Sequence, residues 1–187
     1  MLNVFLNVHF HLEFELIFND VFQNYEVGKT YKLKVFVTNK SKERVKASKE
    51  MARNVRENGR PLIEDAAFRQ RIAQLEVDMK ALEITQYRVV SAYDQQRDGR
   101  PDPLSSVLKV KGTELLQATT ELAMDVGGPM SMPIWAEELA ALSNDPDVGP
   151  EWATQATGSY LFLRAASIYG GTNEIQKNIL TKAVLRL

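Results

Sequence analysis

The spacing of apolar residues changes once along this chain, near residue 41. From Leu2 to Phe18 every even position is apolar, and most odd positions are polar. An alternation of period two is typical of a β-strand with one buried face. A second alternation follows at four positions, Tyr31, Leu33, Val35 and Val37. We therefore expect residues 1–40 to form a β hairpin or a partial β layer.

Beyond Ser41 the apolar positions recur every three or four residues, which is the period of a helix buried on one face. The clearest stripe comprises Phe68, Ile72, Leu75, Met79 and Leu82, and it resumes after Gln86 at Val89 and Tyr93. It predicts a helix of about 35 residues, with Pro61 in its first turn and Gly99-Arg100-Pro101 at its end.

Further helices are expected on both sides of a glycine pair. One runs from Leu104 to Val126 and is stopped by Gly127-Gly128-Pro129. The remaining segments are a short helix at 134–142, a loop at 143–150, a long helix at 151–168 and a last helix from Asn173 to the end. Long amphipathic helices joined by short loops pack as antiparallel bundles. The sequence therefore predicts a mainly α fold, a helical bundle over residues 41–187 preceded by the β segment.

Composition narrows the class of protein. The chain has 187 residues, of which 44% are apolar and 25% charged, as in an ordinary globular domain or a domain with a fragment of another. It contains no cysteine, which excludes thiol nucleophiles and zinc–thiolate sites within it. No apolar run reaches the length of a membrane span, and the start lacks a secretory signal pattern. We expect a cytoplasmic location.

The net charge of −1 conceals a basic segment. Residues 29–60 hold eleven Lys and Arg against three Glu, so this segment carries +8 and the rest −9. Such a segment suits the phosphates of nucleic acid or CoA, and it equally suits a solvated helix face. No aromatic residue lies between residues 40 and 60, so a platform for stacking bases is not supported. We expect no nucleic-acid partner.

Two histidines stand near the start. His9, His11 and Glu13 share one face of the first predicted strand, a spacing that a metal site could use. They are also simply the polar positions of an alternating strand, and we expect no metal. The chain has no phosphate loop of the Gly-x-x-x-x-Gly-Lys type.

The most informative stretch is Ile168-Tyr169-Gly170-Gly171-Thr172-Asn173-Glu174-Ile175-Gln176. Two glycines permit a left-handed backbone, and Thr172 or Asn173 can cap the helix that follows. The first turn of a helix presents N–H donors and the positive end of its dipole, which suits a phosphate or a flavin oxygen. The same pattern also occurs as a plain tight turn between packed helices.

This stretch resembles the closing signature of the acyl-CoA dehydrogenases. The resemblance continues through Asn58–Asp65, Lys111–Glu114 and Gly127-Gly128-Pro129, and it covers about residues 41 to 187, the C-terminal helical domain of that family. It implies an FAD cofactor, an acyl-CoA substrate and a bundle that assembles as a homo-oligomer or with a partner dehydrogenase subunit.

The resemblance also implies site residues. The threonine of the signature and its two followers contact FAD in the family, and by match they are Thr172, Asn173 and Glu174. A glycine pair that reaches the FAD of a neighbouring subunit corresponds to Gly127 and Gly128, although the usual glutamine before it is Met124. A second run that contacts a neighbouring flavin, Arg-x-x-Phe-Gly, falls on Val55–Gly59. Only its glycine matches, with Arg53 and Arg56 as shifted substitutes.

No catalytic base is assigned. In the family a glutamate removes the α-proton of the acyl-CoA thioester while a hydride leaves the β-carbon for the flavin, and burial beside the acyl chain suits a carboxylate to that task. Many members carry this glutamate directly after the signature tyrosine, where this chain has Gly170. Others carry it in a Glu-Arg pair, which Glu43-Arg44 matches only superficially.

Three functions remain open. The first is an FAD-dependent acyl-CoA dehydrogenase, or its FAD-contacting, oligomerising C-terminal portion. The second is a non-catalytic structural or assembly domain derived from the same family. The third is a basic adaptor that binds nucleic acid through residues 29–60, which predicts steeply salt-dependent binding.

Overall fold

The protein is described by a computed structural model over residues 27–95, 103–132 and 150–185. The predicted strand at 2–18, the His9–Glu13 set, the helix at 134–142 and most of the loop at 143–150 lie outside the described residues.

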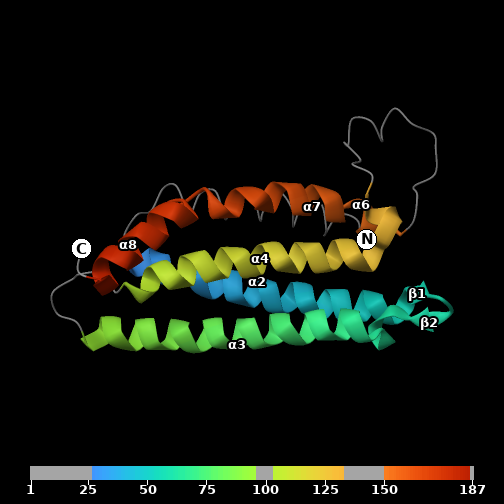
Figure 1. Cartoon of the computed structure of the whole chain (residues 1–187), viewed down its shortest axis with the longest axis horizontal. Helices are drawn as coiled ribbons and strands as arrows, with labels where there is room; N and C mark the ends of the chain where they lie inside the picture. Colours follow the sequence, from blue (N-terminus) through green and yellow to red (C-terminus); the bar gives the residue numbers. More distant parts are fainter. Residues whose placement is uncertain (1–26, 96–102, 133–149, 186–187) are drawn as a thin grey trace.

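Three long helices form the body of the bundle. They are α2 (Val27–Asn54), α3 (Ala66–Gln95) and α4 (Leu104–Gly127). The colours of Figure 1 show that α3 runs opposite to α2 and α4. Helix α4 contacts α2 and α3 on one side and α7 and α8 on the other, so it is the central helix. The helical bundle predicted for the second part of the chain is confirmed.

The first turn of the bundle is a short hairpin. Strand β1 (Arg56–Glu57) pairs antiparallel with β2 (Arg60–Pro61), and the one-turn helix η1 (Leu62–Glu64) follows. Asn58 and Gly59 between the strands have φ of 51° and 79°, the left-handed pair that a tight hairpin turn requires. The hairpin therefore reverses the chain between α2 and α3.

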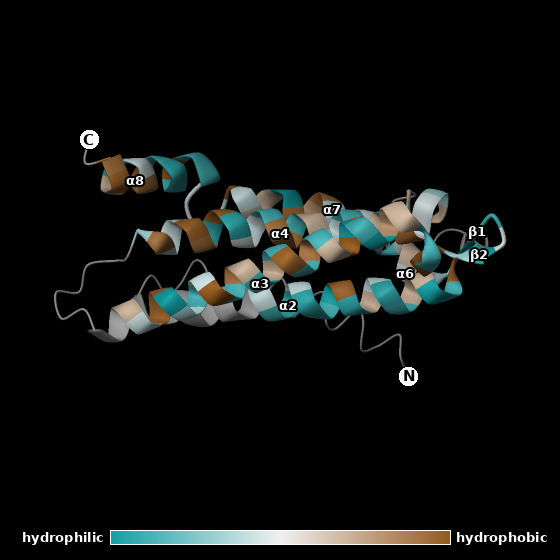
Figure 2. Ribbon diagram, turned by 60° about the horizontal axis from the view of Figure 1, so that its bottom comes forward, coloured by the Kyte–Doolittle hydropathy of each residue, from teal (hydrophilic) through white to brown (hydrophobic). Residues whose placement is uncertain are grey.

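The last part of the chain lies along the outer side of α4. It consists of α6 (Glu151–Thr154), α7 (Ala156–Leu163), the 3₁₀ turn η3 (Arg164–Ser167) and α8 (Asn173–Leu185). Another 3₁₀ turn, η2 (Gly128–Ser131), closes α4. Figure 2 shows α8 beside the start of α4, hydrophilic at its own start and hydrophobic at its end. The turn before α8 is thus carried at the margin of the bundle.

The predicted stripe of α3 is the core of the molecule. Phe68, Ile72, Leu75, Met79, Leu82 and Val89 are all buried, and they pack with Val45 and Ala52 of α2 and with Leu108, Leu115 and Leu122 of α4. The stripe breaks at Gln86, which is also buried. There the Thr38 hydroxyl of α2 donates a hydrogen bond to the Gln86 amide oxygen at 3.2 Å, which satisfies both side chains.

The strand predicted at Tyr31–Val37 is wrong, because these residues belong to α2, and the expected boundary at residue 41 falls inside that helix. The helical phase was hidden because small polar residues take inward positions: Thr38, Ser41 and Ser48 are buried beside Val45. In the sequence Val35 and Tyr31 continue the same spacing toward the start of α2. The period-two pattern of apolar residues at 31–37 therefore lies within a helix and did not indicate a strand.

Two helix bounds also differ from expectation. Pro61 lies in β2, and α3 begins only at Ala66 because the Asp65 carboxylate accepts a hydrogen bond from the Phe68 N–H at 2.8 Å and so caps the helix. The helix expected at 151–168 is broken into α6, α7 and η3. The second break, at Arg164, coincides with hydrogen bonds from a side chain of α4 to the carbonyl oxygens at the end of α7.

Part of the basic segment is an ion-paired helix surface. Lys42 of α2 lies 2.6 Å from the Glu83 carboxylate of α3, and Lys49 of α2 pairs with Glu76 of α3. Within α2, Lys40 pairs with Glu43, and Arg53 pairs with Glu50. At these four of the eleven basic residues, the pairs favour the solvated helix face over a phosphate-binding surface, since carboxylates already neutralise the charges.

Ser41 provides a test of the packing between α2 and its neighbours. Its hydroxyl is buried and has no hydrogen-bond partner. Because an unpartnered buried hydroxyl is destabilising and alanine favours helix, Ser41→Ala should raise the free energy of unfolding by about 1 kcal/mol. Urea unfolding monitored by circular dichroism measures this. The control Thr38→Val should change stability in the opposite direction, because it leaves the buried Gln86 amide oxygen without that donor. A Ser41→Ala chain less stable than the parent would contradict the assigned packing.

Candidate functional site

The predicted glycine turn forms between η3 and α8. Gly170 and Gly171 have φ of 66° and 87°, a left-handed backbone that side chains with a Cβ rarely adopt. The Thr172 hydroxyl accepts a hydrogen bond from the Ile175 N–H at 3.3 Å and caps α8. A Cβ on Gly171 would lie 2.7 Å from the Gln176 side-chain nitrogen, so the Gln176 amide folds back over the turn. The turn is exposed at both glycines.

Asn173 points into the bundle. It is buried, and its amide oxygen accepts hydrogen bonds from the Lys109 ammonium at 2.9 Å and from the Thr113 hydroxyl at 3.2 Å, both on α4. Of the three candidate residues of the closing signature, Asn173 therefore fixes the turn to α4, whereas Thr172 and Glu174 lie on its outer side.

Glu174 is an exposed carboxylate in the first turn of α8. Hydrogen bonds from its own backbone N–H and from the Thr172 hydroxyl hold the pKa of this carboxyl below its usual value, and Lys177 and Lys109 lower it further. Glu174 is consequently an anion at neutral pH, suited to accepting a hydrogen bond and unsuited to retaining a proton there.

Lys109 lies near this carboxylate, on the side of the turn that packs against α4. Burial lowers the pKa of its ammonium, while the nearby Glu174 charge acts in the opposite direction. The Lys109 ammonium also donates to the Ala166 carbonyl oxygen at 3.3 Å. Its contacts thus reach both sides of the turn.

The signature tyrosine is part of a small second core. Tyr169 and Phe162 pack against the buried residues Leu116, Leu163 and Ala166. Burial raises the pKa of the Tyr169 phenol, which is therefore neutral over the physiological range. Tyr169 anchors the turn by packing.

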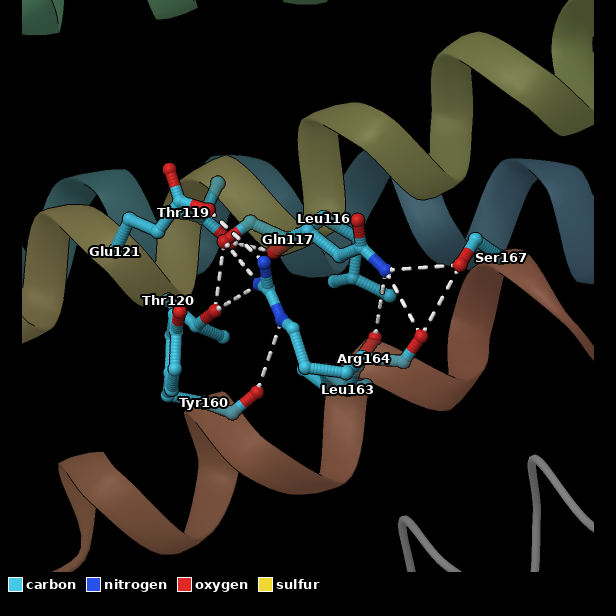
Figure 3. Close-up of polar contacts among 9 residues, drawn as sticks. All are labelled: Leu116, Gln117, Thr119, Thr120, Glu121, Tyr160, Leu163, Arg164 and Ser167. Carbon is cyan, nitrogen blue, oxygen red and sulfur yellow. Dashed lines mark hydrogen bonds and ion pairs between the residues drawn. The ribbon is translucent and has the colours of Figure 1, made fainter. Parts of the chain in front are cut away.

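A polar cluster on α4 explains why α7 ends where it does. Figure 3 shows the Gln117 side-chain amide directed at the last carbonyls of α7, and it donates to the Leu163 and Arg164 carbonyl oxygens at 3.1 Å each. Carbonyls engaged from the side in this way favour the tighter turn η3 over continuation of the α-helix.

Arg164 completes the cluster from the other side. Its guanidinium donates to the Glu121 carboxylate at 2.9 Å and to the Gln117 carbonyl and Thr120 hydroxyl oxygens at 3.1 Å each (Figure 3). The same group lies 4.4 Å from the centre of the Tyr160 ring. These charge-assisted bonds fix η3, and with it the start of the glycine turn, against α4.

The second candidate pair, Gly127 and Gly128, closes the other end of α4. Gly127 is buried, and a Cβ there would lie 2.6 Å from the Ser131 Cβ and 2.9 Å from its hydroxyl oxygen. Gly128 has φ of 51° and ψ of −134°, a conformation open to glycine, and nothing lies within 4 Å of a Cβ built on it. Gly127 is required for packing, and Gly128 is required for its backbone angles.

The hairpin lies at this same end of the bundle (Figure 1). Arg56 donates from its guanidinium to the Gly59 carbonyl oxygen at 3.1 Å across the hairpin, while Arg53 pairs with Glu50. The shifted arginines of the Val55–Gly59 run thus have partners within the chain and remain at the surface.

The structure separates the candidate residues into two groups. Lys109, beneath the Thr172–Glu174 turn, is eighteen residues from Gly127 along α4, about 27 Å at the rise of an α-helix. Figure 1 shows α8 at one end of the bundle and the hairpin with the end of α4 at the other. One copy of the chain therefore does not bring the two groups to a common site.

Among the described residues, the position directly after the signature tyrosine is a glycine, and no catalytic base is assigned. Gly170 follows Tyr169, and Glu43 lies exposed on α2 beside Lys40. Within residues 27–95, 103–132 and 150–185, no group of three or more His, Asp or Glu side chains is placed to hold a metal ion. Over the same residues, no helix combines the length and the apolar character that crossing a membrane requires.

Lys109, Gln117 and Arg164 were missed as site-forming residues. The available signal was a polar spacing of four, Lys109, Thr113, Gln117 and Glu121, on a helix that also carries a buried apolar face. A polar stripe on a central helix indicates a partner element that needs hydrogen bonds.

Comparison with known proteins identifies the family. The model of the acyl-CoA dehydrogenase C-terminal domain matches residues 41–185. The curated relative acyl-CoA dehydrogenase IpdE1 of Mycolicibacterium smegmatis is 30% identical over 124 residues, which cover 66% of this chain and 26% of that protein.

Solved structures share the fold at lower identity. PigA with FAD and proline superposes with a TM-score of 0.65 at 18% identity, over 84% of this chain and 36% of that one. A chain of the ChsE4–ChsE5 complex from Mycobacterium tuberculosis gives 0.60 at 22% identity, over 79% and 35%. The chain thus spans about a quarter of the curated relative and about a third of these structures. It belongs to the acyl-CoA dehydrogenase family, through the C-terminal helical domain of that family.

Proposed function

We propose that this chain is the FAD-contacting, oligomerising portion of an acyl-CoA dehydrogenase and that it completes a flavin site only together with a second subunit. The observation that carries the proposal is the separation of its two candidate groups. The turn before α8 and the Gly127–Gly128 end of α4 lie at opposite ends of one helix. A cofactor that needs both must therefore lie between copies or between this chain and a partner dehydrogenase subunit.

The residues of the turn fit one edge of a flavin nucleotide. Gly170 and Gly171 are exposed and carry no Cβ, so a planar or phosphate group would approach the turn closely once the Gln176 amide, which folds over Gly171, moves aside. The first turn of α8 presents the positive end of the helix dipole beside them. Thr172 and the Glu174 anion would hold donor and acceptor groups of the nucleotide, and Gly128 of the other subunit would approach it from the far side.

FAD, when bound, supplies the acceptor for a hydride from the acyl-CoA β-carbon. The chain's own contribution is to bind and orient the cofactor, since no base is assigned in the described residues. An acyl-CoA substrate would meet its base on another domain or subunit. Two similar proteins support assembly with another subunit as part of the proposal. One relative is called an acyl-CoA dehydrogenase, and one structure of the same fold is a complex of two different chains.

The surface supports assembly. Val77, Ile84 and Tyr87 of α3 expose more than half of their area, and Ile168, Ile175 and Val184 do so at the turn and α8. Large apolar residues gathered on exposed helices are typical of an association surface. These residues favour a homo-oligomer or a complex with a partner subunit.

The test is a visible absorption spectrum of the purified chain after incubation with FAD, recorded along a sizing column. We expect flavin absorbance to elute with an oligomer and to be absent from monomer fractions. The matched control is Gly171→Val, which forces a branched side chain into a left-handed position and should abolish the flavin absorbance of the oligomer.

A colourless oligomer would reject flavin binding and leave the second candidate, an assembly domain without catalysis. One observation favours that candidate: glycine, not glutamate, follows Tyr169. The two candidates differ in the flavin signal and agree on the oligomer, so the same column run separates them.

A further inference from the structure

A single side chain ties together the two flanks of the glycine turn. Ala166 precedes the turn by four residues and Asn173 follows it by two. The Lys109 ammonium donates to the Ala166 carbonyl at 3.3 Å and to the Asn173 amide oxygen at 2.9 Å. One cation from α4 therefore contacts both flanks of the turn.

The contact is well supported on the side of α4. The Thr113 hydroxyl, one helical turn along from Lys109, donates to the same Asn173 oxygen at 3.2 Å. Asn173 is 7% exposed, and Lys109 is the nearest donor to its amide oxygen, because the single Thr113 proton is shared with the Lys109 and Val110 carbonyl oxygens at 3.0 Å each. Ala166 is fully buried. The arrangement is a charge-assisted hydrogen-bond cluster inside the packing between α4 and the turn.

Asn173 stands at the first residue of α8, so its position determines where that helix points. Thr172 and Glu174, which flank it, have their side chains on the outer side of the turn. Any displacement of Asn173 moves both. A rigid support behind a binding loop reduces the entropy that a ligand must remove on binding.

We propose that Lys109 is the positioning residue of this site: by holding Ala166 and Asn173 from α4, it fixes the Gly170–Glu174 turn in the conformation that receives the nucleotide. This rests on the proposed function for the identity of the ligand, and on the contacts alone for the fixing of the turn. Lys109 acts through Asn173 and does not touch the nucleotide.

The chain offers a matched control two residues away. Lys111 is on the same helix, is exposed, and pairs only with Glu114 at 2.8 Å among the contacts described for it. Lys109→Met and Lys111→Met remove the same charge and insert the same side chain. Their difference therefore reports the contacts to the turn.

The first readout needs no ligand. The Gln176 N–H donates to the Thr172 carbonyl at 3.0 Å and the Ile175 N–H to the Thr172 hydroxyl, so both amides are protected when the turn is closed. In the free chain, Lys109→Met should speed hydrogen exchange of these two amides by about tenfold to a hundredfold, as expected for loss of hydrogen bonds from a charged group. Lys111→Met should leave them unchanged. Lys109→Arg, which keeps the charge and the donors, should restore most of the protection.

The second readout is the dissociation constant of FAD, titrated by absorbance. We expect Lys109→Met to weaken binding at least tenfold and Lys111→Met to leave it unaltered. Asn173→Ala gives an independent route, since it removes the acceptor and should add little to Lys109→Met in the double variant.

The outcomes are distinguishable. Unchanged exchange at Ile175 and Gln176 in Lys109→Met overturns the positioning role, whatever FAD does. Exchange that rises equally throughout α2 and α3 also overturns it, because it shows a general loss of stability. A third outcome is faster exchange at Ile175 and Gln176 alone in Lys109→Met, with no FAD binding by the parent chain. This result supports the fixing of the turn by Lys109 and rejects the flavin as its ligand, so only the proposed function fails.

Discussion

Gly127→Ala should lower the free energy of unfolding by about 1–3 kcal/mol, the usual cost of forcing an extra carbon into a packed core. The new Cβ would stand 2.6 Å from the Ser131 Cβ and 3.5 Å from the Ala153 Cβ. Ser131 cannot move easily, because its hydroxyl oxygen lies 2.9 Å from the Met124 carbonyl oxygen and 2.8 Å from that of Gly128, and its one proton is shared between them. The Thr157 hydroxyl in turn donates to the Ser131 carbonyl. Urea unfolding measures the loss.

Gly128→Ala should cost a similar amount, about 1–3 kcal/mol, for a different reason, namely backbone strain at φ 51° and ψ −134°. The two causes separate in a double-mutant cycle with Ser131→Gly, which deletes the Cβ that Gly127→Ala would meet. Ser131→Gly should recover part of the loss in Gly127→Ala and none of it in Gly128→Ala. Equal recovery in both, or a Gly127→Ala chain as stable as the parent, would contradict the assignment of Gly127 to packing.

This prediction bears on the candidate site, since both glycines were singled out by resemblance for a contact with a neighbouring flavin. The structure gives each a separate local reason to be glycine. A flavin contact at Gly128 stays a prediction, and Gly127 is buried beneath it.

The helices with strongly apolar stripes could be predicted from the sequence. Phe68 to Val89 identified α3, and the glycine pair located the end of α4, because burial of one face and a left-handed residue after a helix leave direct marks in the sequence. The start of α3 was misplaced at Pro61 because Asp65, four residues later, supplies the cap. The sequence contains both a proline suited to a first helical turn and an aspartate suited to a cap. The hairpin, which includes Pro61, decides that the helix begins after Asp65.

The strand predicted at Tyr31–Val37 shows the limit of a hydropathy pattern. The inward positions of α2 include Thr38, Ser41 and Ser48, whose small hydroxyl side chains let helices approach closely. A pattern based on apolar residues treats these positions as exposed, and the remaining apolar residues then alternate by accident.

The candidate site was predicted in its sequence-local part only. Thr172 caps α8 and the glycines have positive φ, both as expected from a glycine pair before a capped helix. The partners of Lys109 could not be inferred, because they lie 57 and 64 residues away in the sequence. The choice of Lys109 over the neighbouring Lys111 depends on which side of α4 faces the turn, and that follows from packing.

Two inactive variants should restore each other if the flavin lies between subunits. Gly171→Val disables the turn before α8, and Gly128→Ala disables the opposite end of α4. Each should bind no FAD alone. When both are co-expressed in equal amounts and mix at random, a site has an intact turn in half of the cases and an intact glycine end in half, so about a quarter of the parental FAD capacity should return. The absorbance of flavin per chain in the oligomer fraction measures it.

The return of about a quarter of the FAD capacity distinguishes a site shared between two subunits from a site within one chain. If one chain supplied both groups, every site in the mixture would carry one of the two defects and no FAD would return. Co-expression of the parent chain with Gly171→Val is the control, since about half of the capacity should remain in either arrangement. The 27 Å or so between Lys109 and Gly127 along the rigid helix α4 makes the two-subunit arrangement the expected one.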